Sequence, residues 1–242
     1  MNEKSLLAVI WDFDGTIADT RERNLDVTRA ILRTLGKDPD RHDILKDKDL
    51  YTKGILAYSD WRDFHIIELG MSPAETEQMG PMWGEYQLRS AVEQELYPGI
   101  SEVISSAGLP QGVFSVNSEH TISKFLEKHG LRQHFGSIVG YEQLKGAGKP
   151  DPEGLLKCIY QLGFARGDGT VLYIGDHKTD ILMVENVNNI LTDMRNPPHV
   201  EGTHASYIYG NNLPPEVVPD RKAEKPSDIT AIIRGYNLNE VV

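Results

Sequence analysis

From residue 112 onward the sequence alternates short apolar runs with longer segments whose apolar residues recur at helical spacing, and this alternation constrains the fold most strongly. An apolar run bounded by charged or turn residues is typical of a strand that is buried on both faces. The predicted elements, in chain order, are a strand at 112–116, a helix at 118–130, a strand at 137–139, a helix at 152–162, a strand at 171–174 and a helix at 180–188. Strands that alternate with helices form βαβ units, so the pattern predicts an α/β fold with a parallel sheet.

The N-terminal part supplies one further strand and then a long helical block. The apolar run at 6–11 predicts a first strand of the same sheet, whereas residues 17–95 are predicted to be mostly helical. Because strands on both sides of the block belong to one sheet, we expect a core formed by residues 1–16 and 96–242, with residues 17–95 inserted as a separate helical domain. Within the block, the sequence predicts a helix at 20–35, a polar exposed stretch at 37–50, an aromatic-rich segment at 51–69 and a helix from 73 to about 96.

The C-terminal region completes the predicted core. A last strand is expected at 205–209, followed by a Pro-rich stretch at 214–226 and a terminal helix at 229–234. Ser227 and Asp228 precede this helix and would cap it, because their side-chain oxygens can accept hydrogen bonds from the free N–H groups of a first turn.

The composition of this 242-residue chain excludes several functions. Its 25 Lys and Arg against 36 Asp and Glu give a net charge of −11, which excludes a basic nucleic-acid binder. An anionic small substrate can still bind where a local cation reverses the field. No apolar run approaches the roughly 20 residues that a membrane-spanning helix needs, and we expect neither a membrane segment nor a signal peptide. The single cysteine, Cys158, favours a reducing compartment, so we expect a cytoplasmic protein.

Two pairs of carboxylates follow predicted buried strands. Asp12 and Asp14 come directly after the run at 6–11, and Asp176 and Asp180 follow the run at 171–174. Ligands of open α/β sheets bind beyond the carboxyl ends of the strands, so neighbouring strands would bring these side chains together. Several carboxylates at close range need a bound cation, and a set of oxygen ligands points to Mg²⁺.

Other strand ends offer groups that could hold an anion. Lys149 lies in the segment G-A-G-K-P-D-P at 146–152, between a strand and a helix, where an ammonium could bind a phosphate oxygen. Ser115 lies near the end of the strand at 112–116, but a register that differs by two residues would make Asn117 the inward donor instead. Ser118 is expected to cap the next helix.

Together these segments resemble the haloacid dehalogenase-like hydrolase superfamily. The resemblance rests on D-F-D-G-T at 12–16, Ser115 at a strand end, Lys149 in G-K-P-D-P, and G-D-H-K-T-D at 175–180, and it spans about residues 6–210. It implies a Rossmann-like parallel sheet as the core. It also implies that the block 17–95 is a mobile, all-helical cap domain.

The resemblance further implies a role for each matched residue. Asp12 would be the nucleophile that forms an aspartyl-phosphate intermediate, and it would also bind Mg²⁺. Asp14 would be the general acid and base and would ligate the metal through its backbone carbonyl. Asp176 would be the remaining direct metal ligand, and Asp180 would orient the site or bind the metal through water. The residues implied to bind the substrate's phosphoryl group are Thr16, Ser115 or Asn117, and Lys149.

The second carboxylate, Asp14, narrows the reaction. Superfamily members that cleave carbon–halogen bonds generally lack it, and phosphonate-cleaving members typically carry alanine there, so we expect phosphoryl transfer. The leading hypothesis is a Mg²⁺-dependent phosphatase of a small phosphorylated metabolite. The alternatives are a phosphomutase of a sugar phosphate and, from another class, a non-catalytic binding module. The sequence leaves open the substrate, the oligomeric state and the role of the Asn-rich segment 186–196.

Two features depart from the superfamily pattern, and several residues receive no role. His177 stands where Ser or Thr often occurs, and the segment 183–194 lacks the usual small-residue ending. We expect His177 to pack its loop and the scattered histidines, His65 among them, to be incidental. The aromatic residues of the block 17–95 are expected to form its core.

Overall fold

The computed structural model describes residues 5–145, 148–164, 166–207, 210 and 212–237. The chain divides into two compact units. One unit, the α/β unit, is formed by Met1–Ala18 with Leu96–Val242, and the other, the helical unit, by Asp19–Glu95. Among the described residues, the α/β unit buries two clusters of apolar side chains and the helical unit buries one.

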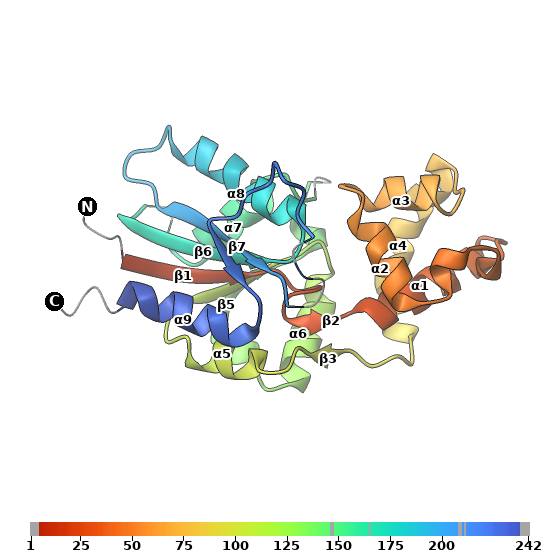
Figure 1. The fold of residues 1–242 in the computed structure, drawn as a ribbon, viewed down its shortest axis with the longest axis horizontal. Coiled ribbons are helices and arrows are strands. Elements are labelled where there is room, and N and C mark those ends of the chain that lie inside the picture. Colours follow the sequence, from red (N-terminus) through yellow and green to blue (C-terminus); the bar gives the residue numbers. More distant parts are fainter. Residues whose placement is uncertain (1–4, 146–147, 165, 208–209, 211, 238–242) are drawn as a thin grey trace. The chain divides into compact units, whose positions relative to one another are not determined.

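The α/β unit is built on one sheet, whose described strands follow the order β5-β4-β1-β6-β7-β8 (Figure 1). Every neighbouring pair is parallel, and β1 lies between β4 and β6. The strands are β1 (Ser5–Trp11), β4 (Gln111–Phe114), β5 (Phe135–Val139), β6 (Gly169–Gly175), β7 (His199–Ala205) and β8 (Arg221–Ala223). This architecture confirms the predicted α/β fold with a parallel, Rossmann-like sheet.

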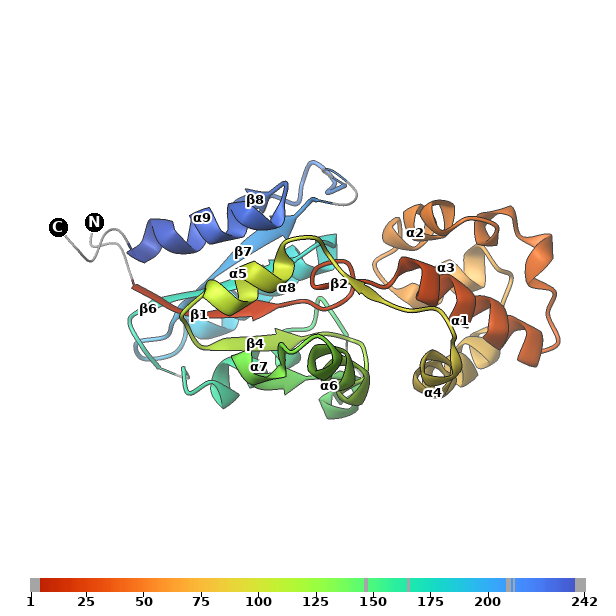
Figure 2. The same ribbon diagram turned by 90° about the horizontal axis from the view of Figure 1, so that it is seen from below.

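Helices cover both faces of this sheet (Figures 1 and 2). Successive side chains of a strand point to opposite faces, so Val9 and Trp11 pack with one set of helices while Ala8 and Ile10 pack with the other. The first set comprises α5 (Ile100–Ser106), α6 (Glu119–Lys128) and α9 (Pro226–Asn237), and the second comprises α7 (Glu153–Gln161) and α8 (Lys178–Leu191). Burial on both sides explains why β1 and β6 are apolar along most of their length.

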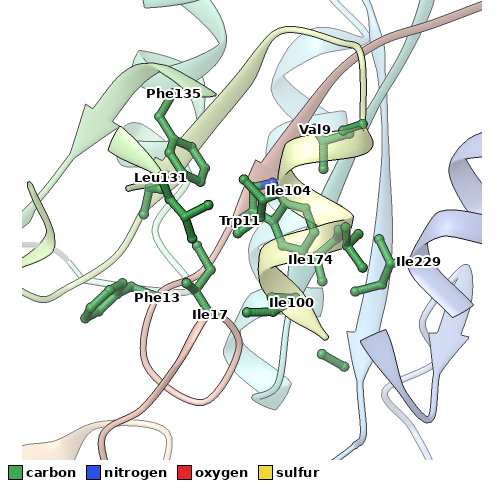
Figure 3. Close-up of a cluster of buried hydrophobic side chains, with 14 of the residues drawn as sticks. Val9, Trp11, Phe13, Ile17, Ile100, Ile104, Leu131, Phe135, Ile174 and Ile229 are labelled. Atoms are coloured by element: carbon green, nitrogen blue, oxygen red, sulfur yellow. The ribbon is translucent and has the colours of Figure 1, made fainter. Parts of the chain in front are cut away.

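Trp11 lies at the centre of the first apolar cluster (Figure 3). Its ring is fully buried, and its Nε1–H donates to Oε1 of Gln111 at 3.0 Å. The Gln111 amide in turn donates to the carbonyl of Ile104 in α5 at 2.8 Å. The buried polar atoms are therefore paired, and burial of each large apolar side chain in this cluster contributes about 1.5 to 3 kcal/mol.

The helical unit packs around an aromatic centre. Tyr51 and Phe64 are buried and meet edge to face with ring centroids 5.5 Å apart, as expected from the aromatic-rich sequence. The helices are α1 (Arg21–Thr34), the 3₁₀ turns η1 (Pro39–Arg41) and η2 (Asp43–Leu45), α2 (Lys48–Leu56), α3 (Trp61–Ile67) and α4 (Pro73–Arg89). Two short strands, β2 (Ala18–Asp19) and β3 (Glu95–Leu96), pair where the chain passes between the units.

The predicted end of the last helix in the helical unit is wrong. Helix α4 ends at Arg89 rather than near Leu96 because Ser90 adopts an extended conformation and its hydroxyl donates to Asp26 at 2.5 Å. The guanidinium of Arg23 donates to the carbonyl of Val92 at 2.8 Å, which holds the following segment outside a helix. Helix propensity depends on local sequence and therefore does not reflect these contacts with residues of α1.

The C-terminal prediction also needs correction. The strand expected at 205–209 is β7, which ends at Ala205, and residues 208–209 lie outside the described residues. Its sequence, H-V-E-G-T-H-A, has no apolar run, and its burial arises from pairing with β6 and β8 and from packing against α8. Helix α9 begins at Pro226, so Ser227 and Asp228 lie in its first turn, where Asp228 accepts the N–H groups of residues 224 and 225. The sequence analysis missed α5 and β8.

Candidate active site

Three buried carboxylates meet at the carboxyl edge of the sheet. Trp11 of β1 lies opposite Ile174 of β6, so Asp12 and Asp176 leave adjacent strands almost side by side. The N–H of Asp12 donates to the carbonyl of Ile174 at 2.8 Å, which holds the two strand ends together. Asp12, Asp176 and Asp180 each offer an oxygen within 4.8 Å of the others. The structure thus brings these three predicted residues together.

Lys149 lies among these carboxylates. Its Nζ is 2.5 Å from Oδ1 of Asp12 and 2.7 Å from Oδ1 of Asp180, and its side chain is only 7% exposed. The same Nζ is 5.5 Å from the ring centroids of both Phe114 and Tyr173. In the motif that contains Lys149, at 146–152, residues 146 and 147 lie outside the described residues.

Asp180 is held by groups of the protein itself. Its Oδ2 accepts the backbone N–H of His177 at 2.9 Å, and its Oδ1 accepts the hydroxyl of Tyr173 at 3.0 Å in addition to Lys149. The side chain is fully buried. His177 serves as the N-cap of α8, with Nδ1 accepting the N–H of Thr179 at 3.3 Å. Three donors of the protein thus fix the position of the Asp180 carboxylate.

The electrostatics of the cluster favour a bound cation. Burial, reinforced by the charges of Asp180 and Asp14, raises the pKa of Asp12 to about 7 despite the attraction of Lys149. Burial and the neighbouring carboxylates also raise the pKa of Asp176 well above its usual range. Burial would likewise raise the pKa of Asp180, but Lys149 and the His177 N–H outweigh it and the pKa is lowered. One ammonium does not balance three carboxylates, and the donors are all hard oxygen atoms, so these residues fit a divalent cation such as Mg²⁺.

Asp14 occupies a different environment from Asp12. Nδ2 of Asn117 donates to its two carboxylate oxygens at 3.0 and 3.3 Å, and the Ser115 hydroxyl lies 3.5 Å from the nearer one. The backbone N–H of Asn117 donates to Oγ of Ser115 at 3.2 Å. The structure therefore places both candidate donors, Ser115 and Asn117, beside Asp14. Ser118 caps α6 as expected, accepting the N–H of Thr121.

Residues 13–18 form the turn that carries Asp14. Gly15 has φ of +75°, and a Cβ there would lie 2.2 Å from Oδ2 of Asp176, so only glycine fits. The Thr16 hydroxyl is fully buried and has no hydrogen-bond partner among the described residues. The Thr16 carbonyl accepts the hydroxyl of Tyr207 at 2.6 Å. The predicted contact between Thr16 and a substrate stays a prediction.

Two tyrosines of the site were missed by sequence reasoning. Tyr173 lies within the apolar run of β6, and a buried tyrosine needs a partner for its hydroxyl, which was an available signal. Tyr207 follows β7 and lies 191 positions along the chain from Thr16, so no local pattern connects the two.

Comparison with known proteins agrees with this arrangement. The sequence model of the family described as haloacid dehalogenase-like hydrolase matches residues 9–190. The N-acetylmuramic acid 6-phosphate phosphatase of Pseudomonas aeruginosa is 29% identical over 75% of this chain and 78% of its own length. The phosphoglycolate phosphatase of Synechococcus elongatus is 25% identical over 72% of this chain and 76% of its own.

Solved structures share the fold. A HAD-superfamily hydrolase of subfamily IA from Geobacter sulfurreducens superposes with a TM-score of 0.60 at 21% identity, covering 96% of this chain and 98% of its own. CbbY from Rhodobacter sphaeroides in complex with phosphate gives a TM-score of 0.68 at 17% identity, covering 93% and 96%. These comparisons confirm the resemblance inferred from the motifs, and the chain belongs to the haloacid dehalogenase-like hydrolases.

Proposed function

We propose that this protein is a Mg²⁺-dependent phosphatase that hydrolyses a small phosphorylated metabolite through an aspartyl-phosphate intermediate. One observation carries the proposal: Asp12 and Asp14 are only two residues apart, yet their carboxyl groups lie in two different environments. Asp12 belongs to the buried cluster with Lys149, whereas Asp14 is held by Asn117 outside that cluster. Two carboxyl groups in different surroundings can take different roles in one reaction.

Asp12 is the proposed nucleophile. Its carboxylate attacks phosphorus, forming an oxygen–phosphorus bond while the bond to the leaving oxygen breaks. Lys149 would bind a phosphoryl oxygen, and Ser115 is proposed to donate to another. The metal ion would be held by the carboxylates of Asp12 and Asp176 and the backbone carbonyl of Asp14. When bound, it supplies positive charge that reduces repulsion between carboxylate and phosphate.

Asp14 is the proposed general acid and base. It donates a proton to the leaving oxygen in the first step and accepts one from the water that hydrolyses the aspartyl phosphate in the second. In the second step the water oxygen bonds to phosphorus while the bond between phosphorus and Asp12 breaks. Asp14 thereby regains its proton and Asp12 its carboxylate before inorganic phosphate leaves. Asn117 supports this role by fixing the orientation of the Asp14 carboxyl group.

The helical unit is the proposed cap that selects the substrate. The curated relatives act, by name, on N-acetylmuramic acid 6-phosphate and phosphoglycolate, which are small phosphorylated acids. We extend to this chain only their shared chemistry, a phosphate monoester on a small organic acid or sugar. No helix in the described part of the chain is long and apolar enough to cross a membrane. The proposal places the enzyme in the cytoplasm.

The test is phosphate release from a panel of sugar phosphates, phosphorylated acids and nucleotides, with Mg²⁺ or with EDTA. We expect release by the wild type with Mg²⁺, none with EDTA, and a loss of at least about a thousandfold in Asp12→Asn, because the covalent step is removed. The matched control is Asp193→Asn, which makes the same change of side chain at an exposed position and should retain full activity.

Turnover of Asp12→Asn near the wild-type rate would exclude Asp12 as the nucleophile. Exchange of phosphate between positions of a sugar phosphate, without net release, would identify a phosphomutase instead.

A further inference from the structure

We propose that Tyr207 is a positioning residue that fixes the turn at 13–18 and thereby aligns Asp14 for proton transfer. This inference rests on the proposed function, since it assigns Tyr207 a part in the work of Asp14. Among the described residues, Tyr207 makes no hydrogen bond to the carboxylate cluster, although the charges of Asp176 and Asp12 act on its hydroxyl, so it would act through the backbone of the turn.

Large apolar side chains anchor the turn in the core at both of its ends. Phe13 and Ile17 are fully buried and belong to the apolar cluster that packs on α5 (Figure 3). Between them, Asp14, Gly15 and Thr16 form a polar stretch. The N–H groups of Gly15 and Thr16 bond to carbonyls within the turn, so the position of this stretch relative to the rest of the core depends on contacts from outside the turn.

Tyr207 supplies such a bond from a distant part of the chain. Its hydroxyl donates to the Thr16 carbonyl at 2.6 Å. Burial raises the pKa of Tyr207 well above its usual value, so the phenol stays protonated and acts as a donor. Its ring meets that of Tyr97 edge to face, with centroids 5.6 Å apart. Because the Tyr97 N–H donates to the carbonyl of Ile17 at 3.2 Å, these contacts hold the C-terminal half of the turn from two sides.

The same half of the turn governs Asp14. Thr16 is two residues from Asp14, and Gly15 between them lies against Asp176 without room for a Cβ. A shift of the Thr16 carbonyl would therefore move Asp14 relative to Asp176 and to its partner Asn117. We infer that loss of the Tyr207 hydroxyl disturbs proton transfer more than substrate binding.

The experiment compares Tyr207→Phe with a matched control, Tyr236→Phe. The control also removes a tyrosine hydroxyl that donates a hydrogen bond, in this case to Glu201, but Tyr236 lies on α9, away from the turn. Each variant is assayed on p-nitrophenyl phosphate, whose leaving group needs little protonation, and on glycerol phosphate, whose alkoxide leaving group needs a general acid. We expect kcat of Tyr207→Phe to fall about tenfold on glycerol phosphate and less than about twofold on p-nitrophenyl phosphate, with KM unchanged.

A second measurement does not depend on activity. Hydrogen exchange of the amides at 13–18 should be faster in Tyr207→Phe than in the wild type and unchanged in Tyr236→Phe. Unchanged exchange, or an equal loss of kcat on both substrates, would overturn the proposal. Failure of the proposed function has a different signature, namely no hydrolysis by the wild type, or an Asp14→Asn variant whose loss is the same for both leaving groups.

Discussion

Replacing Gly15 with alanine tests the contact between the turn at 13–18 and Asp176. A Cβ at position 15 would lie 2.2 Å from Oδ2 of Asp176, whereas ordinary contacts begin near 3.4 Å. The carboxylate must therefore move by about an ångström, and a displacement of that size at a catalytic group can cost about a hundredfold in rate. The positive φ of +75° adds a separate backbone strain of about 1 to 2 kcal/mol.

The matched control for Gly15→Ala is Gly130→Ala. Gly130 has a similar φ of +66°, but in the described part of the chain no atom beyond its own chain neighbours lies within 4 Å of the position that a Cβ would take. Both variants should lose about 1 to 2 kcal/mol, which corresponds to a fall in Tm of about 2 to 8 °C. Only Gly15→Ala should lose activity, because only there would the added Cβ displace Asp176.

The assay measures kcat/KM for phosphate release, the Mg²⁺ concentration for half-maximal activity, and Tm by circular dichroism. We expect Gly15→Ala to lose about a hundredfold in kcat/KM and to require more Mg²⁺, since Asp176 is a proposed metal ligand. Activity of Gly15→Ala within about twofold of Gly130→Ala would refute the argument that glycine is required by the contact with Asp176.

Two further predictions concern buried charges. Lys149→Met should lower kcat/KM by about a hundredfold or more and destabilise the protein by about 3 kcal/mol at pH 7. That deficit should narrow toward pH 5, because without the ammonium the pKa values of Asp12 and Asp180 rise and both carboxyls can bind protons in the folded state. In the helical unit, burial lowers the pKa of His65 to about 4. In the unfolded chain His65 has its ordinary pKa of about 6.5, so between pH 6.5 and pH 4 the unfolded state binds a proton that the folded state does not. The free energy of unfolding should therefore be unaffected by His65 above pH 6.5 and should fall by about 3 kcal/mol by pH 4.

Urea unfolding at several pH values tests both predictions. Lys157→Met, which removes an ammonium from a carbonyl contact away from the site, is the control for Lys149→Met and should show no pH-dependent deficit. A Lys149→Met deficit that is the same at pH 5 and pH 7 would contradict the reasoning. His65→Gln should remove the stability loss between pH 6.5 and 4, whereas His120→Gln at an exposed position should retain it. An unchanged slope in His65→Gln would show that another group titrates.

Several elements of the fold could be predicted because their local sequence reflects their burial. The strands β1 and β6 are apolar along most of their length because both faces are covered, so they were found from pattern alone. The predicted position of β7 was wrong because its polar sequence gives no local sign of burial, which comes from its neighbours β6 and β8 and from α8. The end of α4 was misplaced because contacts from α1 fix the segment that follows it.

The candidate site shows the same division. The sequence predicted that Asp12, Asp14, Asp176 and Asp180 meet, since residues that follow parallel strands emerge at one edge of the sheet. Three of them do, whereas the Asp14 side chain lies outside this cluster beside Asn117. That inference still required β1 and β6 to be neighbours, which is a property of the strand order. The choice between Ser115 and Asn117 could not be made, because it depends on how the segment after β4 turns, and the structure places both beside Asp14.

Short motifs and local periodicities in the sequence establish the α/β class, the family and the chemical groups that gather at the sheet edge. The pairings among those groups follow only from the three-dimensional arrangement. Lys149 lies between Asp12 and Asp180, and Tyr207 bonds to Thr16, because the order and register of the strands bring together residues that are far apart in the chain. Hydrogen bonds and charge pairs act only over a few ångströms, so their partners are set by that spatial order and not by any pattern within a single segment.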